Sequence, residues 1–287
     1  MSVLFERMAI VGLGLIGGSL AKAVKERELV GDILGIGRSS QRLECAKKQG
    51  IIDGYSIQMD EILSKADLVV VATPVGVIVD LIKEMIPFLK KGTIITDVGS
   101  VKKKIVEEVE GFTPDTLYFV GGHPIAGTEN SGFEESFSTL FEGKKCIITP
   151  VTTTKVQALE KVKELWIRVG STVVWMDAGE HDKVFAAISH LPHIVAYSMV
   201  NSLLRIEGFE ENIFSFSAGG FKDFTRIAAS HPVMWRDIAL MNKDKLLPVI
   251  KLFQDYLEEL KEAIGREDAE KLYSEFQKSR RFKRLMR

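Results

Sequence analysis

The sequence predicts an α/β protein in which a Rossmann-type parallel sheet domain precedes an all-α domain. Two observations carry this prediction. Short, continuously apolar, β-rich runs alternate with helical patterns through the first half of the chain, as in a parallel sheet covered on both faces. After a last β-rich run at 173–175, the remaining chain shows helical patterns alone. We therefore expect a dinucleotide-type sheet domain over residues 1–176 and a helical domain over residues 177–287.

The expected elements follow one another regularly along the sheet domain. Strands are expected at 8–13, 32–36, 68–72, 93–97, 117–121 and 145–149. Helical patterns occupy 16–25, 41–49, 77–89 and 102–110. Beyond residue 180 the helices are expected to break around Gly208, at Gly219-Gly220 and at His231-Pro232.

The composition indicates a protein with a substantial hydrophobic core and a net charge too small to produce a strong electrostatic field. Apolar residues make up 46% of it, and 38 Lys and Arg nearly balance 39 Asp and Glu, so we expect no nucleic-acid partner. The two cysteines, Cys45 and Cys146, have no paired spacing, and the first residues do not resemble a signal peptide. We expect a cytoplasmic protein. The basic last ten residues are interpreted as a solvated helix end.

One stretch, residues 184–204, contains no charged side chain and is long enough to span a bilayer. It also contains His190, Pro192 and His193, and two histidines in its middle would be costly in lipid. We therefore expect no membrane association. The stretch is predicted to be a helix in a helical core or in a dimer interface.

A glycine-rich turn, GLGLIG, follows the first expected strand and opens a helix. In that context Gly12 permits the tight turn, Gly14 lets the backbone approach a pyrophosphate, and Gly17 allows close packing of helix on strand. The helix start, with Leu15 and Ile16, supplies free N–H groups and a positive dipole end. The turn predicts a dinucleotide site; a glycine turn that binds nothing is the less favoured alternative.

The end of the second strand indicates which dinucleotide binds. NAD-binding proteins usually carry a carboxylate there, but Asp32 lies at the beginning of the strand. The strand's end is followed by Arg38, Ser39 and Ser40, which suit a 2′-phosphate. We expect NAD(P) with a preference for NADP. In the alternative interpretation Arg38 stacks on the adenine and either cofactor binds.

Polar residues follow three further strands, and the carboxyl ends of parallel strands share one edge of a sheet. Thr73 and Pro74 form a short turn expected beside the cofactor. Ser100 and His123 are expected on the same rim. A histidine titrates near about pH 6.5 and suits proton removal at neutral pH, so His123 is a candidate general base and Ser100 a candidate for orienting it. A histidine that merely caps the following segment is the alternative.

The helical half carries a second polar set. His181, His190 and His193 raise the possibility of zinc, but no carboxylate or cysteine joins them at a ligand spacing, so we predict no metal site. Arg226 is a forked donor suited to a carboxylate. An ordinary helix salt bridge with Asp223 is the alternative for that arginine.

Together these motifs resemble the prephenate dehydrogenase family of tyrosine biosynthesis over nearly the whole chain. The resemblance rests on GLGLIGGS (12–19), TDVGSVK (96–102), GGHPIAGTENSG (121–132), SHLPH (189–193) and GGFKDFTRIA (219–228). It implies oxidative decarboxylation of prephenate to 4-hydroxyphenylpyruvate, with hydride transfer to the nicotinamide. Some family members instead convert arogenate to tyrosine.

The resemblance also implies roles for individual residues. His123 corresponds to the catalytic histidine that takes the proton of the ring hydroxyl, and Ser100 to its hydrogen-bonding partner. Arg226 corresponds to the clamp on the ring carboxylate. Further substrate contacts are expected at His193, His190 and Thr128, and Glu129 is expected near the side-chain end of the substrate.

The resemblance further implies a homodimer formed through the helical domain. We expect no appended regulatory domain, so any inhibition by tyrosine is expected at the active site. Two other interpretations stay open at this point. One is a β-hydroxyacid dehydrogenase, for which Lys183 is the nominee as catalytic lysine. The other is a catalytically silent NADP-binding sensor.

Overall fold

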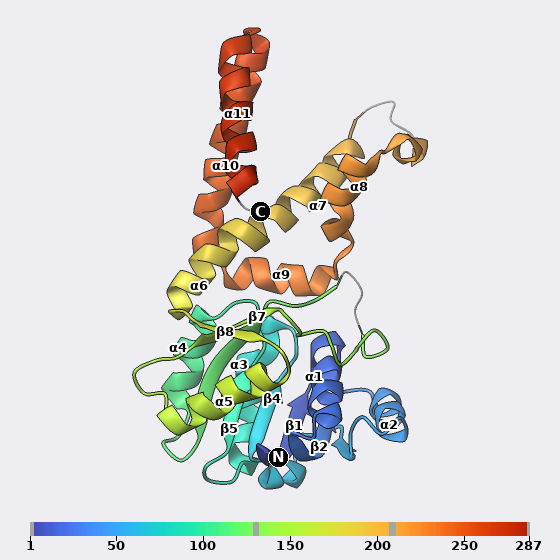
Figure 1. The fold of residues 1–287 in the computed structure, drawn as a ribbon, viewed down its shortest axis with the longest axis vertical. Coiled ribbons are helices and arrows are strands. Elements are labelled where there is room, and N and C mark those ends of the chain that lie inside the picture. Colours follow the sequence, from blue (N-terminus) through green and yellow to red (C-terminus); the bar gives the residue numbers. More distant parts are fainter. Residues whose placement is uncertain (1–2, 129–131, 207–210, 286–287) are drawn as a thin grey trace. The chain divides into compact units, whose positions relative to one another are not determined.

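The computed structural model describes residues 3–128, 132–206 and 211–285 of the chain (Figure 1). The chain divides into two compact units, Met1–Asn242 and Lys243–Arg287, each with its own internal contacts.

The described residues form one eight-stranded sheet, which confirms the predicted α/β class. The strand order is β3-β2-β1-β4-β5-β6-β7-β8. The strands are β1 (Phe5–Val11), β2 (Val30–Ile36), β3 (Gly54–Ser56), β4 (Leu68–Val71), β5 (Ile94–Asp97), β6 (Tyr118–Pro124), β7 (Lys145–Thr149) and β8 (Thr172–Trp175). The first six are mutually parallel, whereas β7 runs antiparallel to β6. The described part of the segment between β6 and β7 contains no crossover helix, which a parallel connection would require.

Helices cover both faces of this sheet. They are α1 (Leu15–Glu26), α2 (Ser40–Lys48), α3 (Ile78–Met85), α4 (Lys103–Phe112) and α5 (Val156–Arg168), with short turns η1 (Glu61–Lys65), η2 (Val75–Val77) and η3 (Ile86–Phe88). Successive side chains of a strand point to opposite faces. Met8 and Ile10 therefore join one core cluster with α1, α2 and α5, while Ala9 and Val11 join a second cluster with α3 and α4.

A run of helices follows the sheet within the first unit. They are α6 (Ala178–Phe185), the π turn η4 (Ala186–His190), α7 (Leu191–Leu203), η5 (Glu211–Phe216), α8 (Gly219–Thr225), η6 (Arg226–Ala229) and α9 (Pro232–Met241). Helix α9 contacts η2, which follows β4. A Cβ atom added at Gly76 would lie 2.8 Å from the Asp237 carboxylate, so the two elements approach closely. Helix α9 thus lies at the carboxyl end of β4, and a domain boundary near residue 176 stays a prediction.

The uncharged stretch 184–204 is helical but interrupted. Pro192 has no N–H to donate to the preceding turn, and the helix accommodates it with the π turn η4. Within α7, whose residues are all described, Ala196 alone is fully buried. Ile188 and Leu204 are 66% and 61% exposed, so the stretch is not the core of this single chain. In the described parts of the chain no helix combines the length and apolarity needed to cross a bilayer.

The second unit is a helical hairpin of α10 (Lys243–Gly265) and α11 (Ala269–Leu285). The Tyr256 hydroxyl of α10 donates to the Glu275 carboxylate of α11 at 2.9 Å. Several large apolar side chains of the hairpin are exposed, namely Leu247, Leu252, Leu257, Ile264, Tyr273, Phe276 and Phe282. The hairpin therefore presents apolar surface that the single chain does not cover.

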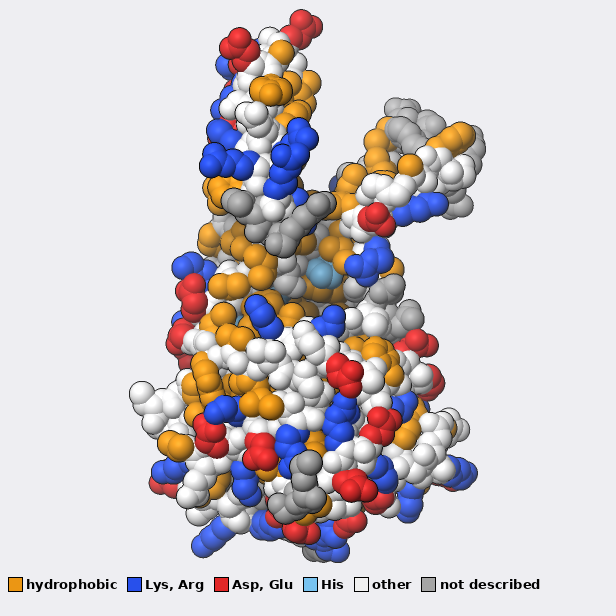
Figure 2. All heavy atoms as spheres, viewed as in Figure 1, with side chains coloured by type: hydrophobic (Ala, Val, Ile, Leu, Met, Phe, Trp, Pro, Cys, Tyr) orange, Lys and Arg blue, Asp and Glu red, His pale blue; other side chains and the backbone are white. Residues whose placement is uncertain are grey.

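Charge is mixed on the face of the sheet unit seen in Figure 2. Lys and Arg side chains alternate there with Asp and Glu side chains, and no patch of one sign dominates this face. This matches the near-zero formal net charge of −1.

Candidate active site

The glycine turn lies between β1 and α1, at the carboxyl edge of the sheet. Gly12 has φ +98°, and a Cβ atom there would lie 2.6 Å from the carbonyl oxygen of Ala72. A Cβ atom at Gly17 would lie 2.1 Å from the Gly12 carbonyl oxygen, so both positions need glycine for internal reasons. At Gly14 nothing lies within 4 Å. The protein itself therefore leaves room for a side chain at Gly14, which suits the predicted approach of a ligand.

The cofactor rim continues with the first turn of α1 and the turn after β4. Leu15 and Ile16 are half-buried at the start of α1, where backbone N–H groups are free to bind an anion. Thr73 is half-buried and Pro74 is exposed. The Thr73 hydroxyl oxygen is buried without a hydrogen-bond partner among the described residues.

The half-exposed carboxylate of Asp32 has an ion-pair partner of its own. The Arg7 guanidinium lies 2.6 Å from it, so Asp32 is not the acidic residue of a ribose site. At the other end of β2, Arg38 is exposed. The Ser39 hydroxyl caps α2 by accepting a hydrogen bond from the Arg42 N–H at 3.3 Å. This end of the strand carries a cation and a helix N-terminus, and no carboxylate.

His123 lies near the end of β6, where it pairs with Ile147 of β7, and it is buried. Its Nδ1 atom lies 2.8 Å from Nε2 of His181, and its ring packs against Phe185 with centroids 5.0 Å apart. Burial lowers the pKa of His123 well below its usual value, and positive charge on His181 and Lys102 would lower it further. His123 is therefore neutral at physiological pH, as a general base must be.

His181 connects His123 to a buried carboxylate. Its Nδ1 atom lies 2.8 Å from the Asp182 carboxylate. That carboxylate also accepts hydrogen bonds from the N–H groups of Lys102 at 2.7 Å and Lys103 at 2.9 Å, at the start of α4. Asp182 thereby fastens α6 to the loop that follows β5.

A buried ion pair supports the same loop. The Lys102 ammonium contacts the Asp97 carboxylate and donates to the Gly122 carbonyl at 2.9 Å, one residue before His123. Burial lowers the pKa of Lys102, and the negative charge of Asp97 opposes that effect. The pair joins the ends of β5 and β6 and so fixes the backbone on which His123 stands.

His190 is buried at the end of the π turn η4, which follows the helix that contains His181 and Asp182. Its Nδ1 atom lies 3.0 Å from the side-chain amide of Asn242, which also donates to the Asp182 carbonyl at 2.8 Å. Its Nε2 atom is buried without a hydrogen-bond partner among the described residues. Burial lowers the pKa of His190 to about 4. A contact between His190 and the substrate stays a prediction.

The remaining predicted substrate residues lie on the helices that follow. His193 is half-buried and stacks on Trp235 of α9 with ring centroids 3.5 Å apart. Burial lowers the pKa of His193, and the positive charge of Arg226, which is exposed, lowers it further. Thr128 is exposed, and Glu129 lies outside the described residues.

The role of Ser100 as the partner of His123 stays a prediction. Ser100 is half-buried in the loop after β5, and its backbone lies close to His190. Within residues 3–128 and the other described segments, no hydrogen bond joins its hydroxyl to His123. The hydrogen-bonding partner of His123 Nδ1 is instead His181. Sequence reasoning missed this role of His181 because it weighed that residue only as a metal ligand. The adjacent polar pair His181-Asp182, four residues into a helix, was the available signal.

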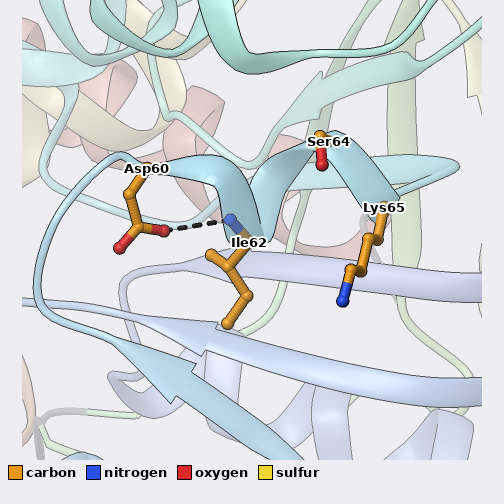
Figure 3. Close-up of a pocket in the computed structure, with 4 residues that line it drawn as sticks. All are labelled: Asp60, Ile62, Ser64 and Lys65. Carbon is orange, nitrogen blue, oxygen red and sulfur yellow. Dashed lines mark hydrogen bonds between the residues drawn. The ribbon is translucent and has the colours of Figure 1, made fainter.

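Three other features lie outside this group. Among the described residues, no set of three or more His, Cys, Asp or Glu side chains could hold a metal ion. Lys183 is largely exposed and pairs with Glu180 at 3.4 Å, which argues against it as a catalytic lysine. The hollow in Figure 3 is lined by Asp60, Ile62, Ser64 and Lys65. It lies around η1, between β3 and β4, and none of the residues around His123 line it.

A glycine turn at a helix N-terminus and a neutral buried histidine on the same sheet edge define a dinucleotide-dependent dehydrogenase. Residues 20–175 match the family model "Prephenate dehydrogenase, nucleotide-binding domain". Residues 177–278 match "Prephenate dehydrogenase, dimerization domain". The chain belongs to the prephenate dehydrogenase family.

Several relatives are similar over almost the whole chain. A prephenate dehydrogenase from Bacillus subtilis is 37% identical, over 99% of this chain and 76% of the relative. A cyclohexadienyl dehydrogenase from Zymomonas mobilis is 36% identical, over 96% of this chain and 94% of the relative. The crystal structure of prephenate dehydrogenase from Aquifex aeolicus, in complex with hydroxyphenyl propionate and NAD+, matches with a TM-score of 0.91 and 40% identity, over 99% of this chain and 98% of that one.

Proposed function

We propose that this protein catalyses the oxidative decarboxylation of prephenate to 4-hydroxyphenylpyruvate, with hydride transfer to NAD(P). The observation that carries the proposal is the placement of His123: it is buried at the carboxyl edge of the sheet, and its Nδ1 atom is already engaged by His181. Its Nε2 atom is thus the one available for a substrate hydroxyl. The Aquifex aeolicus structure, at 40% identity, holds a hydroxyphenyl compound together with NAD+.

The cofactor site fits a dinucleotide. Gly14 has open space around it, and the N-terminus of α1 offers free N–H groups for a pyrophosphate, with Leu15 and Ile16 in its first turn. Thr73 has an unpartnered hydroxyl on the same rim. A bound nicotinamide would supply the hydride acceptor. The protein's own contribution is to position the ring carbon of the substrate and to hold its hydroxyl.

His123 performs the proton transfer in this proposal. As the hydride leaves the hydroxyl-bearing ring carbon, the hydroxyl becomes a carbonyl and Nε2 of His123 takes its proton. Loss of carbon dioxide from the same ring then restores the aromatic system as a phenolate, and His123 returns the proton to its oxygen to give the phenol. The strongly favourable aromatisation leaves the protein mainly an orienting task.

The substrate's carboxylates need cations or hydrogen-bond donors. Helix α7, which contains His193, contacts the turn η6, which begins at Arg226. We assign Arg226 to the ring carboxylate as a forked donor. His193, His190 and Thr128 are assigned to further contacts, and Ser100 to the loop that borders them.

The residues at the end of β2 favour NADP over NAD. Arg38 is exposed, Ser39 already caps the N-terminus of α2, and Asp32 is bound to Arg7. A cation beside a helix N-terminus suits a 2′-phosphate.

A homodimer is proposed through the helical domain, because apolar side chains of α7 and of the hairpin are exposed in the single chain. Inhibition by tyrosine, if present, is proposed to be competitive with the substrate.

The test is a direct assay. Purified protein is mixed with prephenate and either NADP or NAD, and formation of the reduced nicotinamide is followed by its absorbance. Prephenate-dependent reduction supports the proposal, and the ratio of the two cofactor rates tests the preference for NADP. If the cofactor is reduced with arogenate and not with prephenate, the substrate is arogenate and the proposed mechanism still holds. No reduction with either substrate, despite demonstrated cofactor binding, would overturn the proposed function.

A further inference from the structure

A continuous chain of hydrogen bonds leads from the first turn of α4 to the proposed catalytic base. The N–H groups of Lys102 and Lys103 point to the Asp182 carboxylate at 2.7 and 2.9 Å. The carboxylate lies 2.8 Å from Nδ1 of His181, and Nε2 of His181 lies 2.8 Å from Nδ1 of His123. All three side chains of the chain are buried.

The hydrogen-bonding partners of Asp182 determine which atom donates and which accepts in each of these hydrogen bonds. Both oxygens of Asp182 accept hydrogen bonds from backbone N–H groups, which is the behaviour of an ionised carboxylate. A carboxylate can only accept, so Nδ1 of His181 must be the donor to it. In a neutral imidazole the other nitrogen is then an acceptor. Nε2 of His181 therefore accepts, and Nδ1 of His123 must carry the proton.

We propose that Asp182 and His181 form a positioning relay that holds His123 in the tautomer with Nδ1 protonated and Nε2 free to accept the substrate's proton. The inference rests on the proposed role of His123 as the base. Neither Asp182 nor His181 touches the substrate in this account. They act through His123, as the orienting carboxylate does in other histidine-based sites.

The surroundings reinforce the direction of the relay. Asn242 donates to the Asp182 carbonyl and to His190, and so closes the far side of the network. The Lys102 ammonium is directed to Asp97 and Gly122. Phe185 stacks on His181 with centroids 4.5 Å apart and also packs against His123, which excludes water from the link between the two rings.

The first test reads the tautomer directly. The 287-residue chain contains five histidines, so 15N-histidine labelling and two-bond 15N–1H correlation NMR give a tractable spectrum. The His123 signals are assigned with a His123→Asn variant. The inference predicts a protonated Nδ1 and an unprotonated Nε2 for His123 in the wild-type protein. The opposite tautomer would overturn it, whether or not the protein turns over prephenate.

Two variants test the link with activity. His181→Leu removes the acceptor, so His123 should populate both tautomers and kcat should fall by about 10- to 100-fold, a smaller loss than the ~10⁴ seen where an orienting carboxylate is replaced in a serine protease. Cofactor Kd should not change. His181→Gln restores an acceptor oxygen and should recover most of the loss. Lys183→Gln, exposed on the same helix, is the control and should match the wild type.

The outcomes separate the relay from the proposed function. A folded His181→Leu protein with wild-type kcat and an unchanged His123 tautomer would overturn the relay. A wild-type protein that reduces no cofactor with prephenate or arogenate would overturn the proposed function, and the tautomer measurement would still decide the relay. If His181→Leu does not fold, the wild-type tautomer and the His181→Gln kinetics decide it.

Discussion

The imidazole of His193 stacks on the indole of Trp235, with ring centroids 3.5 Å apart and ring planes 19° apart. The His193 Nδ1–H group donates to the Ser189 carbonyl at 2.9 Å, because a carbonyl oxygen can only accept. Two independent contacts thus fix the ring, and Nε2 is left as an acceptor. The stack joins α7 to α9 beside the proposed substrate site.

Truncation of Trp235 tests the importance of this stack. Trp235→Ala should destabilise the protein by about 3–5 kcal/mol, because it removes a large buried ring, and should raise the KM for prephenate as His193 loses its support. Trp235→Phe keeps an aromatic face and should stay within a few-fold of the wild-type KM. Urea denaturation and steady-state kinetics check both. An unchanged KM in a folded Trp235→Ala protein would contradict the stated function of the stack.

Two glycines of the cofactor turn, Gly14 and Gly17, should respond differently to substitution. In Gly14→Val the added Cβ atom meets no protein atom within 4 Å, so the fold should persist while NAD(P) binding weakens by tenfold or more. Gly17→Ala places a Cβ atom 2.1 Å from the Gly12 carbonyl oxygen and should destabilise the fold itself. Thermal melts and cofactor titration by fluorescence separate the two effects. Wild-type affinity in Gly14→Val would argue against a dinucleotide at this turn.

Arg38 should govern the choice between the two cofactors. Its guanidinium is exposed at the end of β2, where a 2′-phosphate would lie. Arg38→Ala should lower kcat/KM for NADP by about 10- to 100-fold, a loss of one strong charged contact, with little change for NAD. Arg42→Ala, on the next turn, serves as the control. Equal losses for both cofactors would instead indicate stacking of Arg38 on the adenine.

The buried histidines predict a loss of stability in acid. The pKa of His190 is lowered to about 4 in the folded protein, against about 6.5 when unfolded. The unfolded chain therefore binds the extra proton first, and stability present above pH 6.5 is lost as pH falls toward 4. At about 1.4 kcal/mol per pKa unit, His190 contributes about 3 kcal/mol to this loss. Urea denaturation at several pH values gives the free energy of unfolding as a function of pH. Between pH 6.5 and 4 this free energy should fall less steeply for His190→Gln than for the wild type. An equal fall in both proteins would contradict the lowered pKa of His190.

Much of the fold was predictable because local patterns encode it. The strand expected at 68–72 is observed as β4 at Leu68–Val71, and the helix expected at 16–25 as α1 at Leu15–Glu26. The edge strand β3 was missed, since three residues, Gly54–Ser56, carry no usable periodicity. The antiparallel direction of β7 was also missed, because strand direction is set by the connection and not by the residues of the strand.

The candidate site was predictable only in part. His123 stood out from its place after an apolar strand, and Gly12, Gly14 and Gly17 from their spacing. The contact between His123 and His181 joins strand β6 to helix α6 across 58 residues of sequence. No local sequence pattern could therefore predict it. The π turn at His190 likewise arises from Pro192 and alters the helical phase that a regular pattern would assume.

The most direct test of the central claim is the turnover of His123→Asn with prephenate. Asparagine keeps a polar side chain of similar reach but cannot take a proton at neutral pH. We expect a loss of at least about 10²-fold in kcat, which is the usual contribution of a general base, with unchanged NAD(P) binding. Wild-type turnover in this variant would show that His123 is not the base and would contradict the account.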